Sequence, residues 1–316
     1  TAEPPVTLWR GIRTRVGRRM TLRTAAWPWP ETKSKKKRTE EPIDPSKQKA
    51  AIEAALAAAS RSDVVIAAVG NGMRQEWEGR DRISLDLPRE QQEFLEKLFE
   101  ANRAVVVVLF NGGPLAVNWA QKNVPAILEA WYPGEQGGHA LAETLFGDVS
   151  PAGRMPMTSF SSVEQLPPLN DCEVRRGRTY LWFTGEPLYP FGHGLSYTRF
   201  EYGELRLSRT AAHPGESLEV ELEITNAGAR DGDEVVQLYV RGPGAGDTSP
   251  LRQLRGFQRL AVPSGMTRRV AFSLAVNDLA LWDDAKGGWG VPRGRYEIQV
   301  GASSADLRQR ANFRIE

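Results

Sequence analysis

The sequence predicts an α/β domain with a mostly parallel sheet, followed by an all-β sandwich. In the first half, continuous apolar runs over 64–69 and 104–110 and a third strand pattern over 126–131 alternate with helical patterns. Such alternation is typical of βαβ units, whose strands are parallel and buried on both faces. After about residue 200, short strand patterns recur between turn signals, which indicates a β-sandwich.

The length also favours two domains, because 316 residues exceed the roughly 250–300 at which a single core stops growing. We expect a layered α/β sandwich domain over 1–160, in which 1–46 form an irregular N-terminal segment. A connector carrying several Pro and Gly residues follows over 161–200, and the β-sandwich covers 201–316.

Helix signals in the first half are clear from Asp44 onward. Asp44 suits a helix N-cap and Pro45 suits the first helical position, so a helix is expected from there to Ser60. A second helix is expected to begin at Pro88, where a stripe of apolar residues at helical spacing follows. A third is expected over 134–146, where Gly147 ends it.

The second half alternates apolar and polar residues most clearly over 218–224, as expected for a strand with one buried face. Turn signals at 226–228 and 231–232 follow this strand. Further short strands are expected over 235–240, 268–274, 295–300 and 311–315.

Composition gives no support for several classes of partner or cofactor. The 41 basic and 39 acidic residues give a net charge of +2, which provides no argument for nucleic acid or an anionic membrane as partner. The basic run Lys33–Arg38 is expected to be a solvated loop. No apolar run approaches the roughly 20 residues of a membrane span. No signal peptide is visible, and the sequence does not predict a cellular compartment. Cys172 is the single cysteine, and no His, Cys and carboxylate cluster has metal-ligand spacing, so neither metal nor cofactor is expected.

The loop 70–82, directly after the first predicted strand, carries the best candidates for chemistry. In open parallel sheets, ligands gather at the carboxyl ends of strands. This loop is dense in carboxylates and arginines around one Trp, and a carboxyl against an aromatic surface can retain a proton for a leaving group. A charged surface loop explains the same residues about equally well. A dinucleotide site is disfavoured, because Gln75 stands where the fingerprint needs its third glycine.

A series of motifs in a fixed order resembles the family 3 glycoside hydrolases. The series begins at 78–82 with a Glu-Gly-x-Asp-Arg segment, which is followed by an apolar run, Pro88 and Gln91. Its last members resemble the fibronectin type III-like domain of that family. The matching segments are 78–82, 85–91, 111–114, 131–138, 146–156, 189–200, 235–240 and 254–257.

The resemblance implies roles for the residues of the loop 70–82. Glu78 is expected to be the general acid/base, with Glu76 as the alternative. Trp77 and Arg82 are expected to contact substrate, and Asp81 is expected to support the loop. The fibronectin-like domain is expected to be a structural buttress.

The same resemblance implies a retaining mechanism, in which a second carboxylate acts as the nucleophile. In the family this is an Asp in a Ser-Asp-Trp-like segment of an N-terminal barrel, and no such segment occurs here. About 45 residues precede Asp44, whereas a barrel needs about 250. We therefore expect the nucleophile barrel to come from a longer chain or a separate subunit.

The expected function is hydrolysis of terminal β-linked glucose or xylose residues, with this chain supplying the acid/base. Substrates would be β-linked oligosaccharides or aryl and alkyl glycosides. The alternative is a non-catalytic carbohydrate-binding or interaction protein, which the missing barrel would allow.

Overall fold

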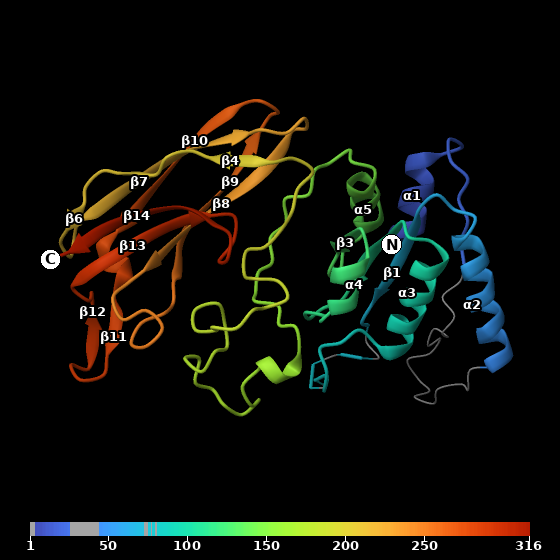
Figure 1. Ribbon diagram of the computed structural model, residues 1–316, viewed down its shortest axis with the longest axis horizontal. Helices are drawn as coiled ribbons and strands as arrows, with labels where there is room; N and C mark the ends of the chain where they lie inside the picture. Colours follow the sequence, from blue (N-terminus) through green and yellow to red (C-terminus); the bar gives the residue numbers. More distant parts are fainter. Residues whose placement is uncertain (1–3, 26–43, 73–74, 77, 80) are drawn as a thin grey trace. The chain divides into compact units, whose positions relative to one another are not determined.

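The computed structural model describes residues 4–25, 44–72, 75–76, 78–79 and 81–316 (Figure 1). The chain divides into two compact units, the first ending at Glu143 and the second beginning at Thr144. The domain limits expected from the sequence, at 160 and 200, stay a prediction.

The first unit is built on a three-stranded parallel sheet, as predicted. Its strands are β1 (Val65–Gly70), β2 (Val105–Phe110) and β3 (Ala126–Glu129), in the order β1-β2-β3. Side chains on both faces of the central strand are buried, since Val107 and Val108 point in opposite directions and are both 0% exposed. This is why the strand reads as an unbroken apolar run.

Five helices accompany this sheet in the described part of the first unit (Figure 1). Asp44 caps the helix that it was expected to begin, because its Oδ1 accepts the Ser46 backbone N–H at 2.9 Å. The short fourth helix was not expected from the sequence. The five are α1 (Leu8–Val16), α2 (Pro45–Ala59), α3 (Arg89–Ala101), α4 (Asn118–Asn123) and α5 (Gly137–Leu145).

Helices α1 and α5 approach so closely that only glycine fits at the contact. A Cβ on Gly11 would lie 1.8 Å from the carbonyl oxygen of Gly138, and one on Gly138 would lie 2.2 Å from that of Thr7. The Gly138 backbone N–H also donates to the Val6 carbonyl at 3.0 Å. The N-terminal stretch expected to be irregular therefore contains a packed helix.

The second unit is a sandwich of two largely antiparallel sheets (Figure 1). One sheet consists of β10 (Thr267–Ala275), β7 (Ser217–Asn226) and β4 (Phe200–Tyr202), with β5 (Arg206–Leu207) also paired to β7. The other has the order β6 (Ala211–Ala212), β14 (Leu307–Ile315), β13 (Gly294–Gly301), β8 (Gly232–Arg241) and β9 (Gln253–Val262). A separate hairpin joins β11 (Leu281–Asp283) to β12 (Gly288–Gly290).

The alternation predicted for 218–224 is confirmed in the sandwich core. Leu218, Val220, Leu222 and Ile224 are at most 3% exposed, while the glutamates that alternate with them are exposed or half-buried. The other predicted strands are also present, each longer by a few residues. The sequence did not predict β9 or the hairpin β11–β12 as strands.

A buried ion pair fixes the segment after α5 to the sandwich within the second unit. Arg154 Nη2 lies 2.8 Å from Glu234 Oε1, and the two side chains are 9% and 3% exposed. Glu234 belongs to β8, so the pair connects residues 80 positions apart in the chain.

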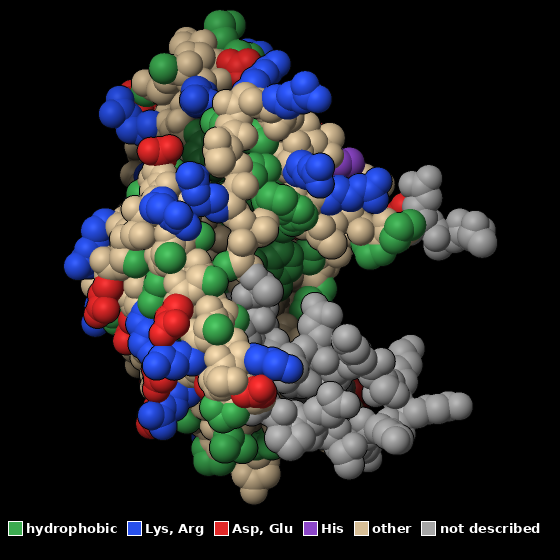
Figure 2. Space-filling view, turned by 90° about the vertical axis from the view of Figure 1, so that its right-hand side faces the viewer, with side chains coloured by type: hydrophobic (Ala, Val, Ile, Leu, Met, Phe, Trp, Pro, Cys, Tyr) green, Lys and Arg blue, Asp and Glu red, His purple; other side chains and the backbone are tan. Residues whose placement is uncertain are grey.

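The face of the molecule drawn in Figure 2 carries side chains of both charges. Lys and Arg side chains are spread over it, and Asp and Glu side chains lie among them in its upper and lower parts. None of the helices in the described ranges is long and apolar enough to cross a membrane.

Candidate active site

The candidate site lies at the carboxyl end of the parallel sheet, where the loops after β1, β2 and β3 meet. The start of the first loop is fixed by the Gln91 side chain, which exchanges two hydrogen bonds with the backbone of Gly70, both at 2.8 Å. Gly70 has φ +146°, and a Cβ there would lie 1.9 Å from the Phe110 carbonyl oxygen. The loop therefore leaves β1 in a backbone conformation that requires glycine.

Glu76 joins all three loops through one carboxylate. Its Oε1 accepts the backbone N–H groups of Gly112 at 2.7 Å and Gly113 at 3.3 Å, from the loop after β2. The Tyr132 hydroxyl, from the loop after β3, lies 3.0 Å from the same oxygen. Tyr132 Oη also lies 3.2 Å from the Asn71 carbonyl, so its single proton is shared between two acceptors.

Arg82 completes this arrangement on the other carboxylate oxygen. Its Nε lies 3.0 Å from Glu76 Oε2, and its Nη2 donates to the Pro114 carbonyl at 2.8 Å. The side chains of Arg82 and Glu76 are 15% and 17% exposed, so the pair is largely shielded from water. Arg82 Nη1 is buried and has no partner among the described residues.

These contacts keep Glu76 ionised. Partial burial by itself raises the pKa of Glu76, but the Gly112 N–H, the Tyr132 hydroxyl, the Arg82 charge and the Gly113 N–H outweigh burial and hold that pKa below its ordinary value. Burial, and then the hydrogen bond to Glu76, raise the pKa of Tyr132. Glu76 is therefore an anion whose carboxylate is held in place by hydrogen-bond donors and by Arg82.

Gly112 is required for this close approach. A Cβ at Gly112 would lie 2.7 Å from Tyr132 Cε2 and 3.0 Å from Glu76 Oε1. This contact explains the glycine at position 112 of the Asn-Gly-Gly-Pro segment, because any larger residue there would push apart the Glu76 and Tyr132 side chains.

Glu129, at the end of β3, is a second carboxyl behind these loops. Its Oε1 accepts the Trp131 backbone N–H at 3.0 Å, and its Oε2 lies 3.4 Å from Asn111 Nδ2. Burial raises the pKa of Glu129 to about 7, although these two hydrogen bonds act in the opposite direction. Trp131 itself has φ +52°, a rare conformation for a bulky residue.

The two carboxyls weighed as proton donors differ sharply in their surroundings. Glu78 is exposed and contacts no hydrogen-bonding or charged group among the described residues. Both carboxylate oxygens of Glu76, in contrast, are bound by neighbouring groups. Asp81 is also exposed and has no partner in the described part of the loop, so its supporting role stays a prediction. Trp77 lies outside the described residues.

Sequence reasoning missed the contributions of Gly112, Tyr132 and Glu129. Each lies directly after, or at the end of, a strand parallel to β1. Their convergence could have been inferred from the rule that parallel strands end at a common edge. Which oxygen bonds which donor depends on side-chain geometry that the sequence does not carry.

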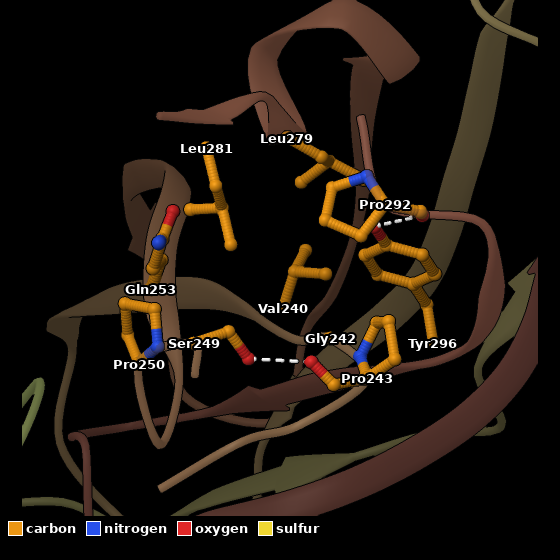
Figure 3. Close-up of a pocket in the computed structure, with 10 residues that line it drawn as sticks. All are labelled: Val240, Gly242, Pro243, Ser249, Pro250, Gln253, Leu279, Leu281, Pro292 and Tyr296. Carbon is orange, nitrogen blue, oxygen red and sulfur yellow. Dashed lines mark hydrogen bonds between the residues drawn. The ribbon is translucent and has the colours of Figure 1, made fainter. Parts of the chain in front are cut away.

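The described residues contain no group of His, Cys, Asp and Glu that could hold a metal ion. A small pocket in the second unit, lined by Val240, Tyr296 and neighbouring residues (Figure 3), has a volume of about 20 Å³. This is room for about one water molecule and not for a sugar.

Comparison with known families agrees with both halves of the fold. The Glycosyl hydrolase family 3 C-terminal domain matches residues 1–197, and the Fibronectin type III-like domain matches residues 234–304. Among solved structures, the β-glucosidase EmGH1 from Erythrobacter marinus has a TM-score of 0.85 at 34% identity and covers 99% of this chain and 44% of its own. A GH3 β-glucosidase from Bifidobacterium adolescentis has a TM-score of 0.78 at 31% identity, over 87% of this chain and 42% of its own.

Curated relatives are similar over most of this chain but are much longer. A β-glucosidase from Rhizobium radiobacter is 39% identical over 284 residues, which cover 84% of this chain and 34% of the relative. A xylan 1,4-β-xylosidase from Xylanibacter ruminicola is 40% identical over 230 residues, which cover 73% of this chain and 26% of the relative. The chain thus spans about a third or less of these relatives. With a family match over more than half of its residues, it belongs to glycoside hydrolase family 3.

Proposed function

We propose that this chain supplies the general acid/base of a retaining β-glycosidase, and that Glu78 is that residue. The nucleophile would come from a barrel domain outside these 316 residues. The observation that carries the proposal is the contrast between an exposed Glu78 and a neighbouring Glu76 that four donors hold as an anion.

This contrast matters because a proton donor must be able to exist in its protonated form. Protonating Glu76 would cost the ion pair to Arg82 and would weaken the hydrogen bonds from Gly112 and Tyr132. Glu78 has no such partner among the described residues. It is therefore free to approach a glycosidic oxygen and to change its protonation state during the reaction.

In the proposed reaction, Glu78 gives its proton to the glycosidic oxygen as the bond to the anomeric carbon breaks. The nucleophilic carboxylate of the barrel forms an ester at that carbon. In the second step, the Glu78 carboxylate takes a proton from water, which attacks the ester and releases the sugar with its configuration retained. The two carboxyls would lie about 5–5.5 Å apart.

The Glu76–Arg82 pair would position the loop that carries Glu78. We propose Arg82 and Trp77 as substrate contacts, on the resemblance of the loop 70–82 to that of the family. The relatives are named for β-glucosides and β-xylosides, which favours a terminal glucose or xylose as the sugar.

The test compares leaving groups in an enzyme assembled from this chain and a family 3 barrel. Glu78→Ala should slow hydrolysis of an alkyl β-glucoside by about 10²–10⁴-fold. The first step for a dinitrophenyl β-glucoside should change little, because that leaving group needs no proton. Equal slowing of both substrates would contradict the assignment.

A simpler experiment separates this proposal from a non-catalytic protein. The 316-residue chain alone should not hydrolyse aryl β-glucosides or β-xylosides, and adding the barrel should restore turnover. If the assembled protein stays inactive but binds oligosaccharides, the non-catalytic alternative is favoured.

A further inference from the structure

A second hollow of the molecule lies far along the chain from Glu78, in the second unit. It has a volume of about 610 Å³ and lies between the hairpin β11–β12, the sheet strand β9 and the segment around Trp182. Pro250, Gln253 and Leu281 line it and also line one side of the small pocket in Figure 3. At this volume it can hold a small oligosaccharide.

Three tryptophans line this hollow. Trp282 and Trp289 are cross-strand partners in the hairpin and meet edge to face, with ring centroids 5.8 Å apart and ring planes at 75°. They are 52% and 72% exposed. Trp182, on the facing segment, is half-buried. Exposed apolar side chains that gather in one patch, rimmed by polar residues, mark interaction sites and ligand-binding grooves.

A hydrogen bond within the hairpin fixes the orientation of the Trp282 ring. Trp282 Nε1 donates to Asp284 Oδ1 at 3.0 Å, and the turn beyond is stabilised by Lys286 Nζ at 2.8 Å from Asp283 Oδ2. A ring held by its own hydrogen bond loses little freedom on binding a ligand. The apolar face of a rigid indole can therefore contribute its full contact area.

Polar groups line the same hollow beside the rings. Arg255 is half-buried, and burial lowers its pKa, while the nearby Asp278 charge acts in the opposite direction. Arg255 Nε is buried without a partner among the described residues. Gln253 and Asn277 add amide groups. The hollow thus offers donors and acceptors with charges of both signs.

This combination identifies the chemistry of the ligand. A pyranose ring presents flat C–H faces, which pack against indole rings, and hydroxyls around its rim that both donate and accept hydrogen bonds. The charges at the hollow are compensated, because Arg175 is paired with Glu173 at 3.1 Å and Arg255 lies near the Asp278 charge, so an anion gains no net attraction. A purely apolar ligand would leave Arg255 and Gln253 unpaired. A neutral sugar matches both features.

We infer that the hollow lined by Trp182, Trp282, Trp289, Arg255 and Asp278 binds a neutral β-linked oligosaccharide, separately from the site of hydrolysis. The choice of a β-linked sugar rests on the proposed function. Such a site would hold a longer substrate near the enzyme while its terminal residue is cleaved.

The test measures binding of cellotetraose and xylotetraose to the 316-residue chain by titration calorimetry. Trp289→Ala should weaken binding by at least about tenfold, as expected for removal of a central aromatic contact. Phe257→Ala is the matched control, because Phe257 is an aromatic residue of the same unit that is 67% exposed and does not line the hollow. The Phe257→Ala variant should bind both sugars with the affinity of the unmodified chain.

No binding of either sugar at millimolar concentration would overturn the inference, as would equal affinities of Trp289→Ala and the unmodified chain. Loss of binding in Glu78→Gln but not in Trp289→Ala would locate the sugar at the parallel sheet. That outcome would overturn this inference and leave the proposed function standing.

Discussion

The most informative perturbation of the candidate site is Glu76→Gln, which keeps the shape of the side chain and removes its charge. The structure gives Glu76 an ion pair to Arg82 at 3.0 Å and short hydrogen bonds from Gly112 and Tyr132. A glutamine oxygen could still accept the latter two. Its amide nitrogen would then face Arg82 Nε, so that two donors oppose each other.

The size of the effect follows from the burial of this pair. Both side chains are less than a fifth exposed, at 15% and 17%. Breaking a fully buried pair costs about 3–5 kcal/mol, and an exposed pair contributes about 0–1 kcal/mol. We expect Glu76→Gln to lower the free energy of unfolding of the first unit by about 2–3 kcal/mol.

The assay is urea unfolding of the 316-residue chain, with hydrogen exchange at the Gly112 amide as a local measurement. Glu78→Gln is the matched control, because it makes the same change two residues away, where no described partner is lost. It should shift stability by less than about 0.5 kcal/mol. If the two variants unfold alike and Gly112 exchanges equally slowly in both, the central role assigned to Glu76 is wrong.

Three other predictions concern neighbouring features of the fold. Gly112→Ala should cost about 1–3 kcal/mol in urea unfolding, because its Cβ would lie 2.7 Å from Tyr132, whereas Gly134→Ala, with nothing within 4 Å, should cost little. Burial raises the pKa of Glu129 from 4.5 to about 7 in the folded chain, so the folded state binds that proton more tightly than the unfolded state. Stability should therefore fall by roughly 3 kcal/mol between about pH 4.5 and 7, and a pH series of unfolding curves for Glu129→Gln should lack this component. Arg154→Ala should cost about 3–5 kcal/mol in the second unit, because it leaves Glu234 charged at 3% exposure; an unchanged melting temperature would contradict this.

Much of the fold could be predicted because its signals are local. The apolar runs at 64–69 and 104–110 require burial on both faces, and the alternation at 218–224 requires burial on one. The cap at Asp44 is equally local. The short helix α4 lacks a capping side chain, so nothing in its sequence marks its start.

The sequence predicts where the candidate site lies, but not which contacts its residues make. The rule for parallel sheets locates the chemistry at the loop 70–82. Whether Glu76 or Glu78 is free depends on which carboxylate meets Gly112 and Tyr132, residues 36 and 56 positions away. Contacts over such separations arise from packing, and no spacing in the sequence encodes them.

The most direct measurement of the central claim is rescue by azide in an enzyme assembled from this chain and a family 3 barrel. In Glu78→Ala, a dinitrophenyl β-glucoside should form the glycosyl-enzyme ester, which water attacks slowly without a general base. Azide needs no base, so it should raise turnover and yield the β-glucosyl azide. Glu76→Ala should show no rescue, since it would disturb the loop and leave Glu78 in place. Rescue of Glu76→Ala but not of Glu78→Ala would contradict the account and make Glu76 the acid/base.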